Sequence, residues 1–458
     1  MKNISFIIFS FLLFSSSFMS AQSITEVINQ MDLDSLQLTL REFSGEQPTI
    51  VNGNEVTITN RVYSNNDLAA DYLFQKLDNL DNLTVTNQLI NGEAGRRNII
   101  ATQLGKTNPD DIYIICAHYD AVADYCADDN ASGTATVLEI ARILSTQCLD
   151  NTIVYALWDE EEIGLVGAGY YANQAAANND NILGVLNIDM MGYDGNNDNN
   201  FDIDVRDVAN SLTMKDDIIA ILNTPEYGFT LDVNVVNPGT TASDHSRFWN
   251  QDFSAVLVGE SWETNDQTPY YHSSNDTYNT LNFPYYFELS KVIMGYMVTK
   301  AGLINVDNTV SQNATTLTAN QDLVSYQWIN CDTNTAIAGE TNQSFIPTIN
   351  GSYAVEITSG SCVEKSACIV FDSLGLQEFD AAEISFYPNP VQENLVVEMS
   401  NLQEDVMLEL YDITGKMVLS KTSSKSKTIL NLSNLGSGVY FIKASTSTKF
   451  SLAKILKD

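Results

Sequence analysis

Histidines and carboxylates stand just after several apolar runs in the first two thirds of the sequence. The chain has only three histidines, and two of them, His118 and His272, are in this set. Acidic residues accompany them in separate segments: Asp120, Asp128-Asp129, Asp159 to Glu162 and Asp189. Two imidazoles and a few carboxylates, with no cysteine among them, form a nitrogen and oxygen donor set that suits Zn²⁺ with an open coordination position. These residue types predict a catalytic metal centre rather than a closed structural one.

Five candidate ligands are more than one catalytic zinc needs. A pair of metals sharing one carboxylate would use all five, and metals about 3.5–4 Å apart activate a bridging water while they polarise a carbonyl. A further carboxylate must then stay off the metals to accept the proton of that water. Glu161 lies directly beside Glu162, so one side chain can face metal and its neighbour can face the water. The pattern predicts metal-assisted hydrolysis in which one of these two adjacent carboxylates is the general base.

Each of these residues has a simpler explanation when it is taken alone. Asp129 precedes a helical pattern that begins near Ala131, and an acid at that place commonly stabilises a helix N-terminus. The simple explanation fails for the whole set, because coincidence does not place five such residues after successive strands in a chain poor in histidine. We therefore interpret them as one site.

The elements that must position this site are short apolar runs separated by longer helical patterns. Continuous apolar runs are typical of strands buried on both faces, and helices between them indicate a doubly wound α/β domain with a mostly parallel sheet. In such sheets the functional groups collect at the carboxyl ends of the strands. The expected strands are Ile112–Cys116, Ile153–Trp158, Leu183–Ile188 and Ala255–Val258, and the expected helices include Ala131–Leu144 and Ala168–Ala177.

Five motifs follow one another in an order that is specific to a known family. They are His118-x-Asp120, Asp128-Asp129-Asn130-Ala131-Ser132-Gly133, Glu161-Glu162-x-Gly164-Leu165, Asp189-Met190 and Tyr271-His272. This series resembles metallopeptidase family twenty-eight, the secreted di-zinc aminopeptidases. The resemblance implies that Asp129 bridges two Zn²⁺ ions. It also implies that His118 and Asp189 complete one zinc site. Glu162 and His272 would complete the second.

The same resemblance implies roles for three more residues. Glu161 matches the general base of the family, and Asp120 matches a carboxylate that would orient the ring of His118. Tyr271 is similar to a tyrosine that, in one branch of the family, donates a hydrogen bond to the developing oxyanion. Its alternative is an ordinary aromatic loop residue. Another branch of the family carries this tyrosine in a disulfide loop. The corresponding residues 238–242 of this sequence contain no tyrosine, which favours Tyr271 as the donor to the oxyanion.

A second acidic cluster runs from Asp194 to Asp204. Its density of oxygen ligands is typical of a Ca²⁺ loop, but it lacks the glycine at position six and the glutamate at position twelve of the helix-loop-helix motif. A solvated turn rich in Asn and Asp explains the same pattern. A Ca²⁺ site and a solvated turn both stay open at this point.

The charge of the chain limits the classes of partner that it can bind. The 458 residues carry a formal net charge of −36, and residues 22–303 hold 41 acidic against 12 basic side chains. Nucleic acid and anionic membranes require a basic footprint, so neither is an expected partner.

Residues 1–21 have a basic start, an apolar run and a small-residue end, which predict a signal peptide. No later segment is long and apolar enough to predict a transmembrane span. Export permits disulfides, but the pairing of the six cysteines does not follow from their spacing.

Two blocks with strand-like patterns follow residues 22–303. Residues 304–372 resemble the immunoglobulin-like β-sandwich modules of surface proteins, with Trp328 and Tyr353 as expected core aromatics. After a linker at 373–382, residues 383–458 resemble the C-terminal sorting domain of the type IX secretion system, a second small all-β sandwich. The matching segments are Tyr387-Pro388-Asn389-Pro390, Leu410 to Lys416 and Leu435 to Ile442. The resemblance implies export through the periplasm and outer membrane by that machinery, to the cell surface or the medium.

These observations predict a secreted, zinc-dependent aminopeptidase that acts on peptide or protein substrates. Glutaminyl cyclase and carboxypeptidase activities occur in the same family and are the enzymatic alternatives. A surface binding protein that keeps the fold without activity is an alternative of another class. Relatives of that kind lose ligands, whereas all five ligand positions and Glu161 are present here.

Overall fold

The computed structural model describes most of the chain after the predicted signal peptide. The described residues are 23–62, 66–262, 264, 266–313, 315–359, 362–372, 377–379, 383–400, 404–446 and 449–458. The signal peptide and most of the predicted linker lie outside these ranges. The chain divides into two compact units, one with the residues up to Thr309 and Ile357–Glu364, and one with Val310–Glu356 and Lys365–Asp458.

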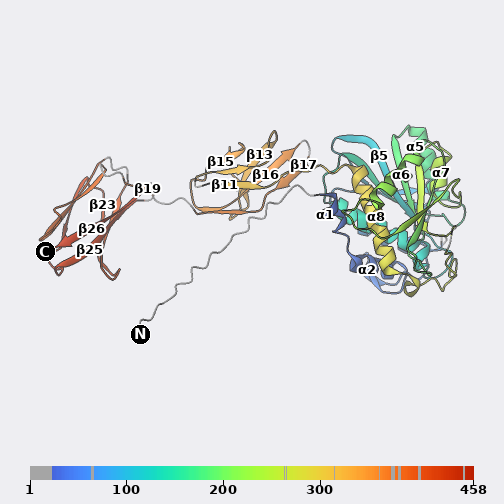
Figure 1. Ribbon diagram of the computed structural model, residues 1–458, viewed down its shortest axis with the longest axis horizontal. Helices are drawn as coiled ribbons and strands as arrows, with labels where there is room; N and C mark the ends of the chain where they lie inside the picture. Colours follow the sequence, from blue (N-terminus) through green and yellow to red (C-terminus); the bar gives the residue numbers. More distant parts are fainter. Residues whose placement is uncertain are drawn as a thin grey trace. The chain divides into compact units, whose positions relative to one another are not determined.

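An eight-stranded sheet in the order β3-β4-β6-β5-β7-β10-β8-β9 runs through the first unit (Figure 1). Its strands are β3 (Thr84–Leu89), β4 (Arg97–Gln103), β5 (Asn108–His118), β6 (Asn151–Trp158), β7 (Ile182–Ile188), β8 (Asn200–Asp204), β9 (Asp232–Val236) and β10 (Ala255–Glu260). The four strands predicted from apolar runs, β6, β5, β7 and β10, are neighbours and mutually parallel. β4 and β8 pair antiparallel with this central group. The α/β prediction is confirmed, with a mixed sheet whose centre is parallel.

Helices cover both faces of this sheet and leave two separate cores. The helices are α1 (Ile24–Ile28), α2 (Leu33–Phe43), α3 (Asp67–Asp78), α4 (Gly133–Leu144), α5 (Val166–Asn178), α6 (Ser211–Leu222), α7 (His245–Trp249) and α8 (Phe283–Ala301). Side chains of α1 to α4, α6 and α8 fill the larger core, and those of α5 and α7 fill the smaller core on the opposite face. A hairpin of β1 (Thr49–Val51) and β2 (Asn54–Val56) stands apart from the main sheet. Among the described helices, none combines the length and the apolar character that crossing a lipid bilayer requires.

Two small sheets pack face to face after the first large domain. Their strands are β11 (Val310–Gln312), β12 (Leu317–Ala319), β13 (Ser325–Asn330), β14 (Thr335–Ala336), β15 (Ser344–Phe345), β16 (Gly351–Ser359), β17 (Cys362–Lys365) and β18 (Ile369–Phe371). Trp328 of β13 stacks on Phe345 of β15 with ring centroids 5.3 Å apart, and Phe345 contacts Tyr353 of β16 at 5.2 Å. Trp328 and Tyr353 are buried, as predicted. A disulfide joins Cys331 to Cys368, a pairing that the sequence left open.

The C-terminal segment forms two further sheets around a single apolar core. Their strands are β19 (Gln377–Glu378), β20 (Ile384–Tyr387), β21 (Asn394–Met399), β22 (Val406–Asp412), β23 (Met417–Ser423), β24 (Lys427–Asn431), β25 (Gly438–Ser445) and β26 (Lys449–Lys457). One sheet has the order β19-β26-β25-β22-β23 and the second has the order β20-β21-β24. Leu408 and Ile442 from the first sheet and Val397 from the second are completely buried in the shared core. Alternation of buried and exposed residues along β22 and β24 is the pattern of strands with one solvated face.

Candidate metal centre

The predicted ligands come from the carboxyl ends of three adjacent parallel strands and from two loops. His118 is the last residue of β5, and Asp189 directly follows β7. Glu162 lies in the turn after β6. Asp129 precedes α4, and its peptide bond to Asn130 is cis. His272 belongs to the loop between β10 and α8. The fold thus brings all five side chains to one edge of the sheet, as expected for parallel strands.

The five side chains form two groups of ligand atoms that share Asp129. In the first group, Nε2 of His118 lies 3.3 Å from Oδ1 of Asp129 and 3.3 Å from Oδ1 of Asp189. In the second group, Nε2 of His272 lies 3.3 Å from Oδ2 of Asp129 and 3.1 Å from Oε2 of Glu162. Each carboxylate oxygen of Asp129 therefore faces a different group.

These contacts fit metal ligation better than hydrogen bonding. Asp129 Oδ2, Glu162 Oε1 and Asp189 Oδ1 are buried and accept no hydrogen bond from the described residues. Burying carboxylate oxygens without donors is costly, so the groups require a cation. Tetrahedral ligands about 2.0–2.2 Å from Zn²⁺ lie roughly 3.3–3.6 Å from one another, close to the separations within both groups. The donor set and its spacing both fit zinc.

Burial and mutual charge set the protonation of these groups. Burial opposes ionisation of Asp129, but the imidazoles of His118 and His272 outweigh it and hold the pKa of Asp129 below its usual range. Burial raises the pKa of Glu162 to about 8, with the charge of Asp129 adding to the effect. Burial also raises the pKa of Glu161 well above its ordinary value, although the charge of His118 opposes the shift. The cluster therefore carries more carboxylates than its own imidazoles neutralise.

Asp120 connects the ring of His118 to the turn that bears Glu161 and Glu162. Its carboxylate is completely buried. Nδ1 of His118 lies 3.2 Å from the carbonyl oxygen of Asp120 and 3.5 Å from its Oδ1, which directs Nε2 towards Asp129. The backbone N–H groups of Glu161 and Glu162 donate to the same carboxylate at 3.1 and 3.2 Å. Sequence reasoning anticipated the contact with His118 but not the contacts with the turn.

We expect Asp120→Asn to lower zinc affinity or turnover by about 10–100-fold, the usual cost of losing a partner that orients a ligand. Asparagine keeps the size of the side chain but replaces one acceptor oxygen by a donor, which opposes the N–H groups of Glu161 and Glu162. Zinc titration by calorimetry, together with thermal unfolding of the metal-free protein, separates this effect from a general loss of stability. Unchanged zinc affinity and turnover in a folded variant would contradict the role.

Glu161 and Tyr271 line one cavity of about 360 Å³ with the five candidate ligands. Glu161 is only 9% exposed, whereas Tyr271 is 42% exposed. The Tyr271 ring stacks on the ring of His272, with centroids 3.7 Å apart, and makes an edge-to-face contact with the Trp262 ring, with centroids 4.6 Å apart. The structure therefore brings together all eight residues predicted for the site.

Two supporting residues could not be found by spacing. Asp276 accepts hydrogen bonds from the backbone N–H of Asp128 at 2.9 Å and of Asp129 at 3.0 Å, so it fixes the turn that carries the shared carboxylate. The hydroxyl of Ser243 donates to Oδ2 of Asp189 at 2.7 Å. Both contacts join loops that are far apart in sequence. The one sequence signal is that Asp276 follows the Tyr271-His272 motif by four residues; Ser243 lies beside none of the five motifs.

The acidic segment from Asp194 to Asp204 divides between a turn and a strand. Asp194 accepts hydrogen bonds from the backbone N–H of Asp198 at 3.2 Å and from the side-chain amide of Asn282 at 3.1 Å. Asp202 and Asp204 belong to β8. Among the described residues, no three carboxylate or imidazole ligands of this segment converge as those of the metal centre do. The Ca²⁺ alternative is not confirmed.

Two family models match this chain. Residues 98–297 match Peptidase family M28, and residues 385–458 match the secretion system C-terminal sorting domain. A probable zinc metalloprotease of Leptosphaeria maculans is 40% identical over 104 residues, which are 21% of this chain and 24% of that protein. A probable aminopeptidase of Saccharomyces cerevisiae is 28% identical over 214 residues, 44% of this chain and 56% of that protein. The matched region thus spans about half or less of these relatives.

A solved structure shares the architecture of the first domain. The LapA aminopeptidase of Legionella pneumophila aligns with a TM-score of 0.52 at 19% identity, covering 61% of this chain and 74% of that one. At this identity the likeness concerns the fold alone. The two family models identify a Peptidase family M28 domain at residues 98–297 and, after it, a secretion system C-terminal sorting domain at residues 385–458.

Proposed function

We propose that this protein is an exported zinc-dependent aminopeptidase that removes amino-terminal residues from peptides. The observation that carries the proposal is the pair of ligand groups that share Asp129, with Glu161 lining the same cavity. His118, Asp129 and Asp189 would hold one Zn²⁺, and Glu162 and His272 would join Asp129 around the second. The names of the relatives, aminopeptidase and zinc metalloprotease, support the same class of activity.

The side chains around the ligands supply the remaining chemistry. Bound zinc would polarise the scissile carbonyl and lower the pKa of the attacking water. Glu161 accepts the proton of that water and passes it to the leaving amine, which a buried carboxylate with a raised pKa is suited to do. Tyr271 donates a hydrogen bond to the oxygen that becomes negative in the transition state. Asp120 holds the turn with Glu161 in place throughout.

Three alternatives make different predictions about metal and substrate. Glutaminyl cyclases of the family keep one zinc, whereas the shared Asp129 favours two. A carboxypeptidase would release residues from the other end of the peptide. A binding protein without activity would not need Glu161 beside a complete ligand set. We therefore favour the aminopeptidase.

Metal analysis and a panel of aminoacyl chromogenic substrates test the proposal together. We expect two zinc ions per chain, complete loss of hydrolysis after dialysis against a chelator, and recovery when Zn²⁺ is added back, because the three buried carboxylates need the cations. Acetylated versions of the same substrates serve as a control and should not be hydrolysed by an aminopeptidase. Chelator-resistant activity would contradict the metal mechanism, and hydrolysis of the acetylated substrates would contradict the aminopeptidase.

The C-terminal domain supports a proposal for location. We infer that residues 383–458 direct the chain through the outer membrane by the type IX machinery, after residues 1–21 direct it to the periplasm. The match to a secretion system sorting domain supports the first step. In this organisation residues 22–303 form the peptidase domain and residues 304–372 form the immunoglobulin-like module that separates it from the sorting domain.

A further inference from the structure

One basic side chain lines the cavity of the metal centre. Arg247 belongs to α7 and borders the same space of about 360 Å³ as the candidate ligands. Among the described residues that line this cavity, it is the only lysine or arginine. The acidic residues that line it are Asp129, Glu161, Glu162 and Asp189. A guanidinium group in this place has either a structural partner in the protein or a ligand in the cavity.

Arg247 has few partners in the protein. Its Nη2 donates to the carbonyl oxygen of Gly164 at 2.6 Å, the single hydrogen bond of this guanidinium to the described residues. Its Nε is buried and donates to none of them. Both carboxylate oxygens of Asp244 are buried without a hydrogen bond, so this nearby acid does not bind the guanidinium either. Because a guanidinium has five N–H donors, most of them remain for a ligand.

The contacts of Arg247 place its guanidinium at the edge of the cavity. The stem of the side chain lies over α5, where a Cβ atom added at Gly169 would be 3.6 Å from Cδ of Arg247. Gly164 belongs to the turn after β6 that also bears Glu162, and it lines the cavity. A Cβ atom added at Gly164 would have no described atom within 4 Å outside its chain neighbours. The guanidinium therefore stands beside open space next to the candidate ligands.

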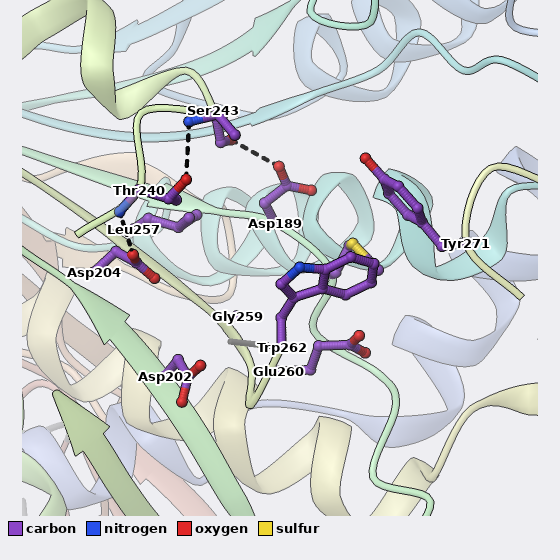
Figure 2. A pocket seen from close by; sticks show the side chains of 12 residues that line it. Asp189, Asp202, Asp204, Thr240, Ser243, Leu257, Gly259, Glu260, Trp262 and Tyr271 are labelled. Carbon is purple, nitrogen blue, oxygen red and sulfur yellow. Dashed lines mark hydrogen bonds between the residues drawn. The ribbon is translucent and has the colours of Figure 1, made fainter. Parts of the chain in front are cut away.

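A second cavity, of about 120 Å³, indicates the direction in which a peptide crosses the site. It shares four lining residues with the cavity of the metal centre, Asp189, Met190, Ala242 and Tyr271. From there it continues to Leu257 and Trp262 (Figure 2). Gly164 and Arg247 line only the cavity of the metal centre.

A cavity as small as the second one holds a single side chain. If the protein is an aminopeptidase, as proposed above, the side chain next to the scissile carbonyl belongs to the amino-terminal residue. With that side chain in the second cavity, the part of the peptide that is released lies on the other side of the metal centre. It then passes Gly164 and Arg247.

The charge of the cavity favours an anion beside Arg247. The charges of two Zn²⁺ ions would balance those of the four acidic side chains that line the cavity when all four are ionised. Arg247 is then the lining side chain whose charge is left over. The planar fork of a guanidinium matches a carboxylate, to which it donates two parallel hydrogen bonds. A dipeptide carries a carboxylate on its second residue, whereas a longer peptide has an uncharged peptide group at that place.

We propose that Arg247 binds the free carboxylate of a dipeptide and that the protein therefore prefers dipeptides to longer peptides. The guanidinium donates hydrogen bonds to the carboxylate while the scissile carbonyl lies at the metal centre. The proposal deepens the aminopeptidase assignment and depends on it for the direction of the substrate. A role in which Arg247 only holds the turn at Gly164 is the structural alternative.

The sharpest test compares leucyl-alanine with leucyl-alaninamide, in which an amide replaces the carboxylate. We expect kcat/KM for the free acid to exceed that for the amide by about tenfold or more, the ratio that a charge-assisted hydrogen bond provides. Arg247→Gln should bring the ratio close to one. Arg247→Lys keeps the charge without the fork and should give an intermediate ratio. Lys106→Gln removes an exposed positive charge from the same domain and should keep the wild-type ratio.

The ratio separates carboxylate binding from a structural role, because a disturbed turn at Gly164 lowers hydrolysis of both peptides alike. A wild-type ratio of one or less would overturn the inference and leave the aminopeptidase standing. A high ratio that persists in Arg247→Gln would also overturn it, because another group would then bind the carboxylate. Thermal unfolding shows whether Arg247→Gln is folded. If it is not, an undiminished ratio in Arg247→Lys would overturn the inference in the same way.

Calorimetry with the zinc-loaded Glu161→Gln protein gives a readout that needs no turnover. Leucyl-alanine should bind more tightly than its amide, and adding Arg247→Gln should remove the difference. This result supports the role of Arg247 even if the wild-type protein hydrolyses neither peptide, which would reject the aminopeptidase alone. Equal affinities for the acid and the amide would overturn the inference. Hydrolysis of N-acetyl-leucyl-alanine that depends on Arg247 would support its carboxylate site and reject the aminopeptidase in favour of a carboxypeptidase.

Discussion

Glu161→Gln is expected to lower kcat by about 10²–10⁴-fold, the usual contribution of a positioned general base. Glutamine keeps the size and the hydrogen-bonding reach of the side chain but accepts no proton. Glu161 is not among the ligand atoms of either metal group. The backbone N–H of Glu161 donates to Asp120 and holds the turn in place, and the substitution preserves this N–H. Zinc content should therefore stay at two per chain while turnover falls. Steady-state kinetics with metal analysis of the same sample measures both quantities.

The matched control is Glu55→Gln, which makes the same chemical change at an exposed position in β2. It should keep both activity and zinc. A Glu161→Gln enzyme that retains wild-type turnover would show that another group moves the proton. A variant that loses zinc as well would place Glu161 among the ligands, contrary to the geometry of the two groups.

Asp129→Asn is expected to have a still broader effect, because Asp129 is the only residue that belongs to both ligand groups. An amide offers one oxygen as ligand, and its NH₂ group points a donor at the other metal position. Losing a partner that only orients a ligand lowers metal affinity by about 10–100-fold. We expect the loss of the shared ligand Asp129 to lower zinc affinity by more than that. Hydrolysis should then drop to background at zinc concentrations that saturate the wild-type protein.

Zinc titration monitored by calorimetry and by activity tests this expectation, with Asp81→Asn as a control at an exposed acid of the same domain. Thermal unfolding without metal shows whether the variant is folded. Two zinc ions bound with unchanged affinity would contradict the shared role of Asp129. Loss of only one zinc with full activity would indicate that a single ion suffices for hydrolysis.

The predictable part of the fold was the part buried on both faces. β5, β6, β7 and β10 contain continuous apolar runs because helices cover them on each side, and such runs are visible in sequence. β3 and β9 lie at the edges of the sheet and mix exposed with partly buried residues, so they gave no comparable signal. β8 was missed for a different reason. Its alternating acids suggested a cation-binding turn, although they mark the face of a strand that looks onto a cavity.

The candidate ligands and their order were predicted from sequence alone, because these residues stand in short local motifs that resemble a known family. Only the tertiary structure decided how they divide. The two oxygens of Asp129 face different groups, and Asp276 supports the turn that holds them from a loop nearly 150 residues away. The pairing of β8 with β10 likewise placed Asp202 and Asp204 beside Leu257 and Gly259. Contacts of this kind depend on strand register and on loops that are far apart in sequence, and the local spacing of residues predicts neither.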